Sequence, residues 1–221
     1  MMQKRSVIIG NYDTAANGWT LTALSLSDPE QKTHYIEKTA GDGSWDLSTA
    51  MTDGIPRYRD RSLALTLECS EGIRAERTTL ISDMINRLDG LEWQIVLPDH
   101  PDHYLVGRVH IGVGFHTLAH SGVTVAATVQ PWLYNAQEKA YTLTATTSEK
   151  STVLSNEGRK VLVPMLTVTG TVLLKYGTSS ITLTDAGSYE WPTLLLTPGD
   201  HTLKYSGDGA LAVKYREAVL R

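Results

Sequence analysis

The sequence predicts a mainly β protein of two domains, and three observations support this. Apolar and polar residues alternate along much of the chain, which is the period of a strand with one buried face. Groups of glycine, proline and aspartate separate the alternating runs and favour turns. Beyond residue 135 the runs become shorter and lie closer together. We therefore expect one domain over residues 1–134 and a second over residues 135–221.

Four alternating runs define the first domain, which we expect to be a split barrel or to resemble a β-sandwich. They lie at residues 63–67, 93–97, 105–113 and 123–129. One segment has helical spacing instead, because apolar residues recur there at intervals of three and four. It predicts a single helix over residues 79–89, with Thr78 or Thr79 as the N-terminal cap and Gly90 as the stop. This helix would cover one side of the sheet.

The second domain is predicted to be a small antiparallel β-sandwich. An alternating stretch at residues 141–145 precedes a loop that extends to residue 160. Short strands then follow one another with regular turns, which is typical of a sandwich. We expect them at residues 161–168, 171–176, 180–184, 193–196, 201–205 and 210–215.

Charge and cysteine content exclude several classes of protein. The formal net charge is -4 and the basic residues are dispersed, so no surface is suited to neutralising nucleic-acid phosphates. Cys69 is the only cysteine, which excludes an intrachain disulfide and a thiolate-rich metal site. The apolar run at residues 7–9 is too short for a signal peptide or a membrane span. We expect synthesis in a reducing cytoplasm and no membrane insertion.

One group of residues has the composition of a metal site. His100 and His103 lie beside two aspartates, and these side chains are able in principle to hold a divalent ion. The segment is turn-like and lacks a helix that would present both histidines together, so we favour a polar hairpin tip. His116 and His120 lie between strands, and the same reasoning applies to them.

Catalytic motifs are also missing from the sequence. The acids Asp42, Asp46, Glu68 and Glu71 lie in or next to turns, and nothing indicates that two of them face each other as glycosidases require. No nucleophile elbow, phosphate-binding loop or dinucleotide fingerprint is present. We therefore expect a protein that is not an enzyme and that needs no cofactor or metal.

Several motifs resemble those of one family when they are taken in order. Residues 41–48 read Gly-Asp-Gly-Ser-Trp-Asp-Leu-Ser, and Arg57-Tyr58 and an alternating strand at residues 61–67 follow. Downstream, residues 104–109 read Tyr-Leu-Val-Gly-Arg-Val, and Pro131-Trp132 closes the region. This order resembles the opening domain of the distal tail proteins of siphophages. Residues 163–164, 187–189, 196–203 and 215–220 resemble the galectin-like sandwich of the short members.

The resemblance implies a structural role at the tail tip of a virion. Six copies would form a ring that joins the tail tube protein to the tail-tip hub or spike protein. DNA would pass through the ring without specific binding, and the net negative charge is compatible with this. The galectin-like domains would project outward, where some relatives hold receptor-binding proteins.

We hypothesise which residues form the junction between ring subunits. The candidates are one tryptophan, one tyrosine and three arginines: Trp45, Tyr58, Arg59, Arg61 and Arg108. Exposed strand edges at residues 63–67 and 105–113 would contribute to the ring-forming sheet.

Two other functions compete with the ring subunit. In the first, the second domain is a carbohydrate-binding module in which Tyr189, Trp191 and Tyr205 stack on sugars. Packing in the domain core is the alternative role for these rings. In the second, the protein is a glycan-cleaving tail enzyme, which requires a cleft with two facing acids.

Overall fold

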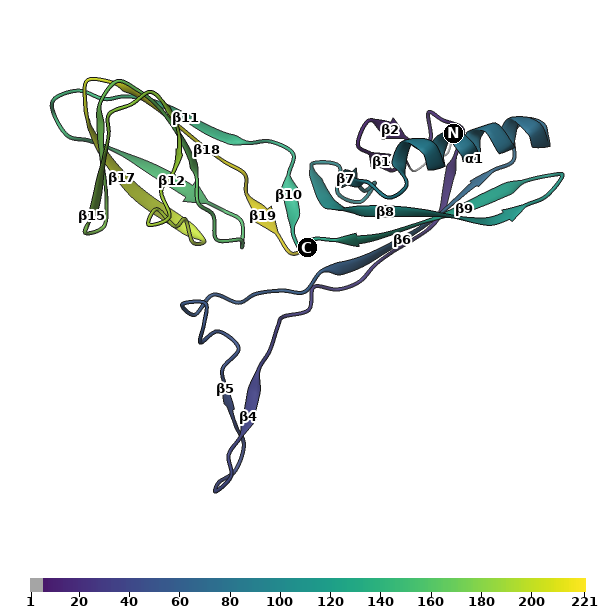
Figure 1. Cartoon of the computed structure of the whole chain (residues 1–221), viewed down its shortest axis with the longest axis horizontal. Helices are drawn as coiled ribbons and strands as arrows, with labels where there is room; N and C mark the ends of the chain where they lie inside the picture. Colours follow the sequence, from purple (N-terminus) through teal and green to yellow (C-terminus); the bar gives the residue numbers. More distant parts are fainter. Residues whose placement is uncertain (1–5) are drawn as a thin grey trace. The chain divides into compact units, whose positions relative to one another are not determined.

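The computed structural model describes residues 6–221, which form two compact units (Figure 1). The first unit ends at Pro131 and the second begins at Trp132, whereas the sequence placed the boundary after residue 134. Antiparallel strands make up most of the ordered structure, and α1 (Arg74–Leu88) is the one helix within residues 6–221. The prediction of a mainly β chain with a single helix is confirmed.

A single twisted sheet forms the body of the first unit, in the order β2-β1-β7-β8-β9-β6-β3. The long central strands pair along their full length, so their alternating side chains fall on two distinct faces. Leu63, Leu65 and Leu67 are buried on one face, and Ser62 and Ala64 are exposed on the other. The strands are β1 (Ile8–Ile9), β2 (Tyr12–Asp13), β3 (Thr20–Leu26), β6 (Arg61–Cys69), β7 (Glu92–Val96), β8 (His103–His116) and β9 (Ser121–Val129).

Helix α1 begins five residues earlier than the sequence predicted. The hydroxyls of Thr78 and Thr79 donate to the carbonyls of Arg74 and Ala75 one turn back, so both threonines lie inside the helix and cap nothing. At the observed N-terminus of the helix, the Glu76 carboxylate accepts a hydrogen bond from the Ile73 amide. The helix ends before Gly90, as predicted, and its buried stripe includes Ile81, Met84 and Leu88.

Two antiparallel sheets form the second unit and enclose a shared core. One has the order β11-β18-β13-β16 and the other the order β12-β17-β14-β15. A short pair, β10 (Leu133–Asn135) with β19 (Ala218–Val219), joins the two ends of this unit. The remaining strands are β11 (Lys139–Thr144), β12 (Lys150–Asn156), β13 (Met165–Thr169), β14 (Val172–Tyr176), β15 (Ser179–Leu183), β16 (Gly187–Glu190), β17 (Gly199–Gly207) and β18 (Ala210–Tyr215).

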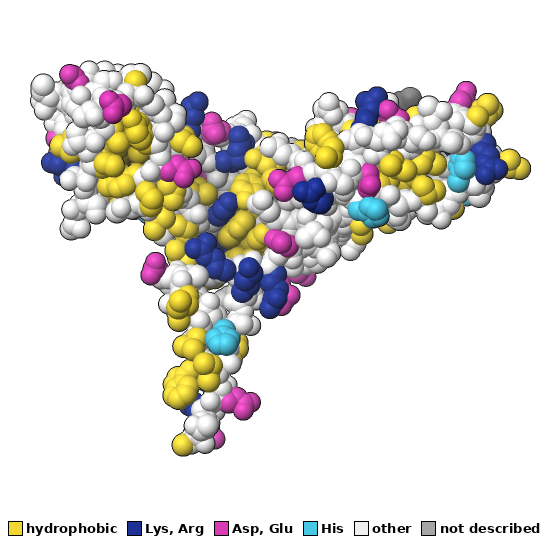
Figure 2. Space-filling model, viewed as in Figure 1, with side chains coloured by type: hydrophobic (Ala, Val, Ile, Leu, Met, Phe, Trp, Pro, Cys, Tyr) yellow, Lys and Arg dark blue, Asp and Glu magenta, His cyan; other side chains and the backbone are white. Residues whose placement is uncertain are grey.

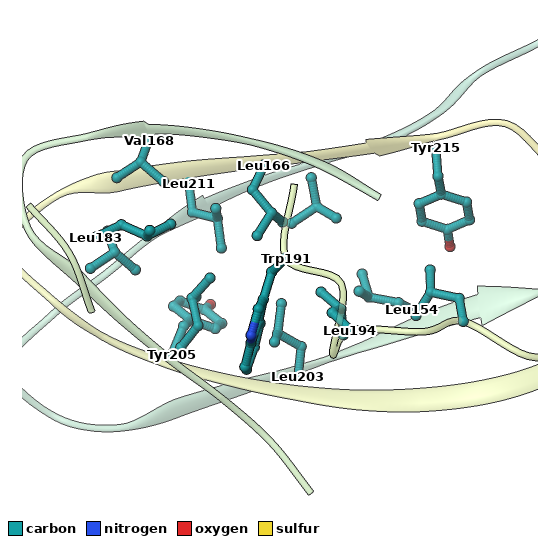
Figure 3. Packing of buried hydrophobic residues seen from close by; sticks show 14 of the residues in the cluster. Leu154, Leu166, Val168, Leu183, Trp191, Leu194, Leu203, Tyr205, Leu211 and Tyr215 are labelled. Carbon is teal, nitrogen blue, oxygen red and sulfur yellow. The ribbon is translucent and has the colours of Figure 1, made fainter. Parts of the chain in front are cut away.

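The core of the second unit contains aromatic and aliphatic side chains from both sheets. Figure 3 shows Trp191 between the layers, with Leu166 on one side and Leu203 on the other. Tyr205 lies in the same cluster. Burial of such large side chains supplies most of the stabilisation of a domain this small.

Three strand predictions in this unit need correction. Residues 193–196 form no strand, because Leu194 donates to the Trp191 carbonyl in a turn and both Leu194 and Leu196 point into the core. A single bridge between Leu162 and Leu196 is the only pairing there. Strand β12 lies in the segment that was predicted to be a loop, and β16 was not predicted. Both are edge strands, which have one neighbour only and need less apolar alternation.

Replacing Trp191 with alanine tests the core of the second unit. We expect the free energy of unfolding to fall by about 3–5 kcal/mol, because a large buried ring leaves a cavity. Denaturant unfolding followed by circular dichroism measures this. The matched change Trp45→Ala removes an exposed ring and should alter the free energy by no more than about 0.5 kcal/mol. Equal effects of the two variants would contradict this assignment of the core.

Candidate functional site

A hairpin arm extends from the first unit between β3 and β6. It spans residues 27–60 and carries the two-stranded pair β4 (Tyr35–Glu37) and β5 (Ser44–Asp46) at its outer part. Nearer the sheet, a bridge between Gln31 and Tyr58 holds the two sides of the arm together. Backbone bonds of 2.8 Å reinforce this bridge, one from Lys32 to the Arg57 carbonyl and one from Arg59 to the Glu30 carbonyl. We call residues 27–60 the arm.

Apolar side chains are exposed along the arm (Figure 2). Trp45 is 56% exposed and Met51 is 96% exposed. Tyr35, Ile36 and Leu47 are exposed as well, and every residue of β4 and β5 lies at the surface. Exposed apolar side chains gathered on one segment in this way typically mark a site of protein association.

The arm has backbone order but no hydrophobic core of its own. At its outer part the Ser48 hydroxyl accepts from the His34 amide, and the Ser48 amide donates to Asp46 Oδ1 at 2.9 Å. Hydrogen bonding from Ser48 lowers the pKa of the Asp46 carboxyl. An isolated two-stranded hairpin is marginally stable in water, so this pair is suited to gaining stability by packing against another surface.

The predicted junction residues occupy different environments. Trp45 is exposed on β5, facing Ile36 across the hairpin, and Tyr58 lies at the bridge with Gln31. Arg59 is exposed and pairs with Glu30 at 3.1 Å. Arg61 is only 3% exposed, and its Nε donates to the Ser27 carbonyl at 2.6 Å. Arg61 therefore anchors the base of the arm to the sheet, which gives it a structural role before any contact with a partner.

Substitutions at Arg61 and Arg59 distinguish the buried arginine that anchors the arm from the exposed arginine in an ion pair. We expect Arg61→Ala to lower the free energy of unfolding by about 1.5–3 kcal/mol, because the change removes a buried side chain and its charged hydrogen bond to the Ser27 carbonyl. Arg59→Ala should change it by less than about 1 kcal/mol, because exposed ion pairs contribute little. Urea unfolding of the two variants measures the difference. A result in which Arg59→Ala costs as much as Arg61→Ala would reject this distinction.

Arg108 lies on the open face of the sheet, on the side opposite α1. Its Nη1 donates to the Gly90 carbonyl, and its strand neighbours across the sheet are Glu92 and Thr128. The open face encloses a shallow concavity of about 960 Å³, whose charged lining residues include Asp60 and Glu92 as well as Arg108. Both signs of charge are present, and the other lining side chains are mostly small.

The three candidate sugar-stacking residues offer no aromatic platform. Trp191 and Tyr205 are 8% and 7% exposed and belong to the core of the second unit. Tyr189 is half-buried on β16, packs against the same core and donates its hydroxyl to the Asp185 carbonyl. These rings therefore pack in or against the domain core, which is the alternative role given to them in the sequence analysis.

A polar cluster closes the end of the second unit where β11 begins. Lys139 Nζ lies 2.8 Å from Glu217 Oε1, which also accepts from the Glu157 amide at 2.6 Å. Burial by itself lowers the pKa of Lys139, but hydrogen bonds to Glu217 and Glu157 raise it above its ordinary value. Nearby, Tyr215 donates to the Ser155 carbonyl at 2.7 Å. Burial and the neighbouring Tyr141 hydroxyl raise the pKa of Tyr215.

These shifts predict a loss of stability at alkaline pH. Lys139 and Tyr215 both keep their protons more tightly when folded, so the unfolded chain releases protons first once the pH passes about 10. Their contribution is complete below that pH and is lost as the pH rises further. Urea unfolding at pH 8, 9.5 and 11 measures the slope, which Tyr215→Phe should reduce. An unchanged slope in Tyr215→Phe would contradict the contribution of this hydroxyl.

Within residues 6–221, no group of three or more histidine, cysteine, aspartate or glutamate side chains has a metal-binding arrangement. His100 and His103 are linked through the backbone, where the His103 amide donates to the His100 carbonyl in a turn. The same described residues contain no helix with the length and apolar character needed to cross a membrane.

Comparison with known proteins identifies a structural neighbour. No family model matches the sequence, and no curated protein matches it significantly. Among solved structures, the crystal structure of the phage SPP1 Dit protein superposes with a TM-score of 0.70 at 14% sequence identity. The alignment covers 97% of this chain and 99% of that chain.

The fold is that of SPP1 Dit. That protein is described as a paradigm of the hub adsorption apparatus in phages that infect Gram-positive bacteria. The coverage means that both units, and not the second sandwich alone, have counterparts in the Dit protein. At this identity the likeness establishes the fold, including the split into a helix-covered sheet and a sandwich.

Sequence inspection recognised part of the arm. It singled out residues 41–48, which include Trp45, and Tyr58, but it missed the exposed apolar residues Tyr35, Ile36 and Met51. One signal was available, since Tyr35 and Ile36 form an apolar pair shortly before the turn, and Ile36 pairs with Trp45 after it. Their exposure could not be predicted from the sequence, because a short apolar run has the same local pattern in a core and on a surface.

Proposed function

We propose that this protein is a structural subunit of a phage tail tip, a distal tail protein that assembles into a hexameric ring. The observation that carries the proposal is the match to SPP1 Dit over nearly the whole length of both chains. The ring would join the tail tube protein to the hub or spike protein and let DNA pass through its centre. The second unit, as a galectin-like sandwich, would face outward and is available to a receptor-binding protein.

The arm supplies one of the two surfaces that a ring requires. A closed ring forms when two different surfaces of each subunit bind head to tail and the rotation between neighbours closes. Trp45, Met51 and the other exposed apolar residues of the arm are suited to packing on the adjacent subunit. A permanent contact buries on the order of 2,000 Å² or more, and an extended arm adds area that the compact sheet lacks.

The sheet of the first unit offers a second means of association. Strand β3 is at one edge of that sheet and pairs with β6 only. Its outer backbone groups are available to a strand from a neighbour, which is a common route to assembly. Trp45 and Tyr58 on the arm would lie at the junction, with Arg59 close by. Arg61 would act through the arm whose base it holds, and we keep Arg108 as a candidate on the open face.

An enzymatic role has no support in the described residues. The structural neighbour is a component of an adsorption apparatus, and its described role is not a catalytic one. The carbohydrate-binding alternative requires exposed rings, and the rings first considered for it lie in or against the core.

Removing the apolar surface of the arm tests the proposed ring. We expect the unmodified chain to form rings of six subunits, seen in negative-stain micrographs and as six times the subunit mass in light scattering. The double variant Trp45→Ser, Met51→Ser should shift the population to monomers by at least about tenfold, because central apolar contacts dominate association. Its free energy of unfolding should stay unchanged, since both side chains are exposed.

Val153→Ser is the matched control, because it removes an exposed apolar side chain from the second unit. It should leave the rings intact. If the unmodified chain is a monomer alone, the same variants are compared for binding to the tail tube and hub proteins. A chain that stays monomeric and binds neither component would refute the proposed function.

A further inference from the structure

A buried arginine links α1 to the turn between β8 and β9. Arg77 is 1% exposed, and the described residues provide it with no carboxylate partner. Its Nη1 donates to the Gly72 carbonyl at 2.5 Å, and its Nη2 donates to the carbonyls of Thr117 and Leu118 at 3.3 and 2.7 Å. The guanidinium therefore holds the hairpin turn against the start of the helix.

The fourth acceptor of Arg77 is shared with a histidine. Arg77 Nε donates to Ser121 Oγ at 3.2 Å, and His116 Nδ1 lies 2.6 Å from the same oxygen. The other ring nitrogen, His116 Nε2, lies 3.0 Å from Thr78 Oγ1. We call Arg77, His116, Ser121 and Thr78 the latch.

The hydrogen bonds of the latch select one protonation state of His116. Arginine only donates, so Ser121 Oγ accepts from Arg77 and has its own proton free for His116 Nδ1. Thr78 donates its proton to the Arg74 carbonyl at 3.0 Å, so it accepts from His116 Nε2. Both ring nitrogens of His116 and both hydroxyls of the latch have a partner of the right kind when His116 is neutral and carries its proton on Nε2.

Protonation of His116 breaks this arrangement in two ways. With a proton on Nδ1, His116 would donate to Ser121 Oγ, which already accepts a hydrogen bond from Arg77. The Ser121 hydroxyl proton would then lose its acceptor at a residue that is 0% exposed. The imidazolium would also share Ser121 Oγ with the buried Arg77 guanidinium, and two like charges this close repel.

We propose that the latch is a proton-sensitive switch that releases the β8–β9 turn from α1 when His116 is protonated. The turn, residues 117–120, carries Leu118, which is 81% exposed, and Ile73 beside the helix start is exposed as well. The latch is complete while His116 is neutral, and it opens when His116 takes up a second proton. This inference does not depend on the proposed ring.

Charged and titratable groups from three elements surround the latch. Helix α1 contributes Arg74, Arg77 and Glu76, and the Glu76 carboxylate accepts from the Ile73 amide. The end of β6 contributes Cys69, which pairs with Ser121, and Glu71 follows it.

The turn contributes His120, whose ring packs edge-on against Phe115 at 5.1 Å between centroids. Neither His116 nor Arg77 has an ion pair with an acid in the described part of the chain.

Amide hydrogen exchange of the full chain tests the switch. The Thr117 amide donates to the His120 carbonyl, and the His120 amide donates to Thr117 Oγ1, so both report on the closed turn. After correction for the intrinsic effect of pH on exchange rates, we expect the amides of residues 117–120 to exchange roughly tenfold faster at pH 5 than at pH 7.5. A tenfold change corresponds to the loss of about one charged hydrogen bond from the closed turn. Amides of β18, in the second unit, serve as the internal reference.

Three variants separate the latch from other effects of pH. His116→Gln keeps a neutral polar side chain and should show no pH-dependent change in the turn. His34→Gln removes an exposed histidine of the arm and should behave as the unmodified chain does. Ser121→Ala removes the shared acceptor and should exchange rapidly at both pH values. Equal exchange at both pH values in the unmodified chain, or an equal response in His116→Gln, would overturn the proposal.

Discussion

The pairing of β6 with β9 is the constraint on which the first unit depends. Nine residue pairs run without a break from Arg61 with Val129 to Cys69 with Ser121. Because the register is unbroken, every second side chain of both strands falls on the buried face of the sheet. The same two strands also position the ends of the sheet: Arg61 holds the base of the arm at one end, and Ser121 holds the latch at the other.

Two buried arginines of this unit have the same kind of role. Both donate to backbone carbonyls: Arg61 fastens the arm to the sheet, and Arg77 fastens the β8–β9 turn to the start of α1. A charged group in such a place is costly unless its donors are satisfied, so these side chains stabilise one conformation of the segment over others. The arm and the β8–β9 turn are therefore ordered where they leave the sheet, although their outer residues are exposed.

The second unit is stabilised separately, by a sandwich core around Trp191. Its aromatic residues were ambiguous from the sequence, since a ring that stacks on a sugar and a ring that fills a core have the same local pattern. Burial decides between the two roles. The structural match extends over both units, so the whole chain, and not the sandwich alone, shares the fold of SPP1 Dit.

Much of this architecture was determined by the sequence itself. Alternation at residues 63–67 and 123–129 places strands and their buried faces, because a period of two is a local property of extended backbone. The helix was recognisable from its apolar spacing, but its start was not, since Thr78 and Thr79 bond within the helix. Only the tertiary structure decided that Trp45 is exposed while Trp191 is buried, and that Arg61 is an anchor while Arg59 is free to face solvent. It also decided that Arg77 reaches Ser121 beside His116, because Arg77 and Ser121 are 44 positions apart and no local pattern relates them.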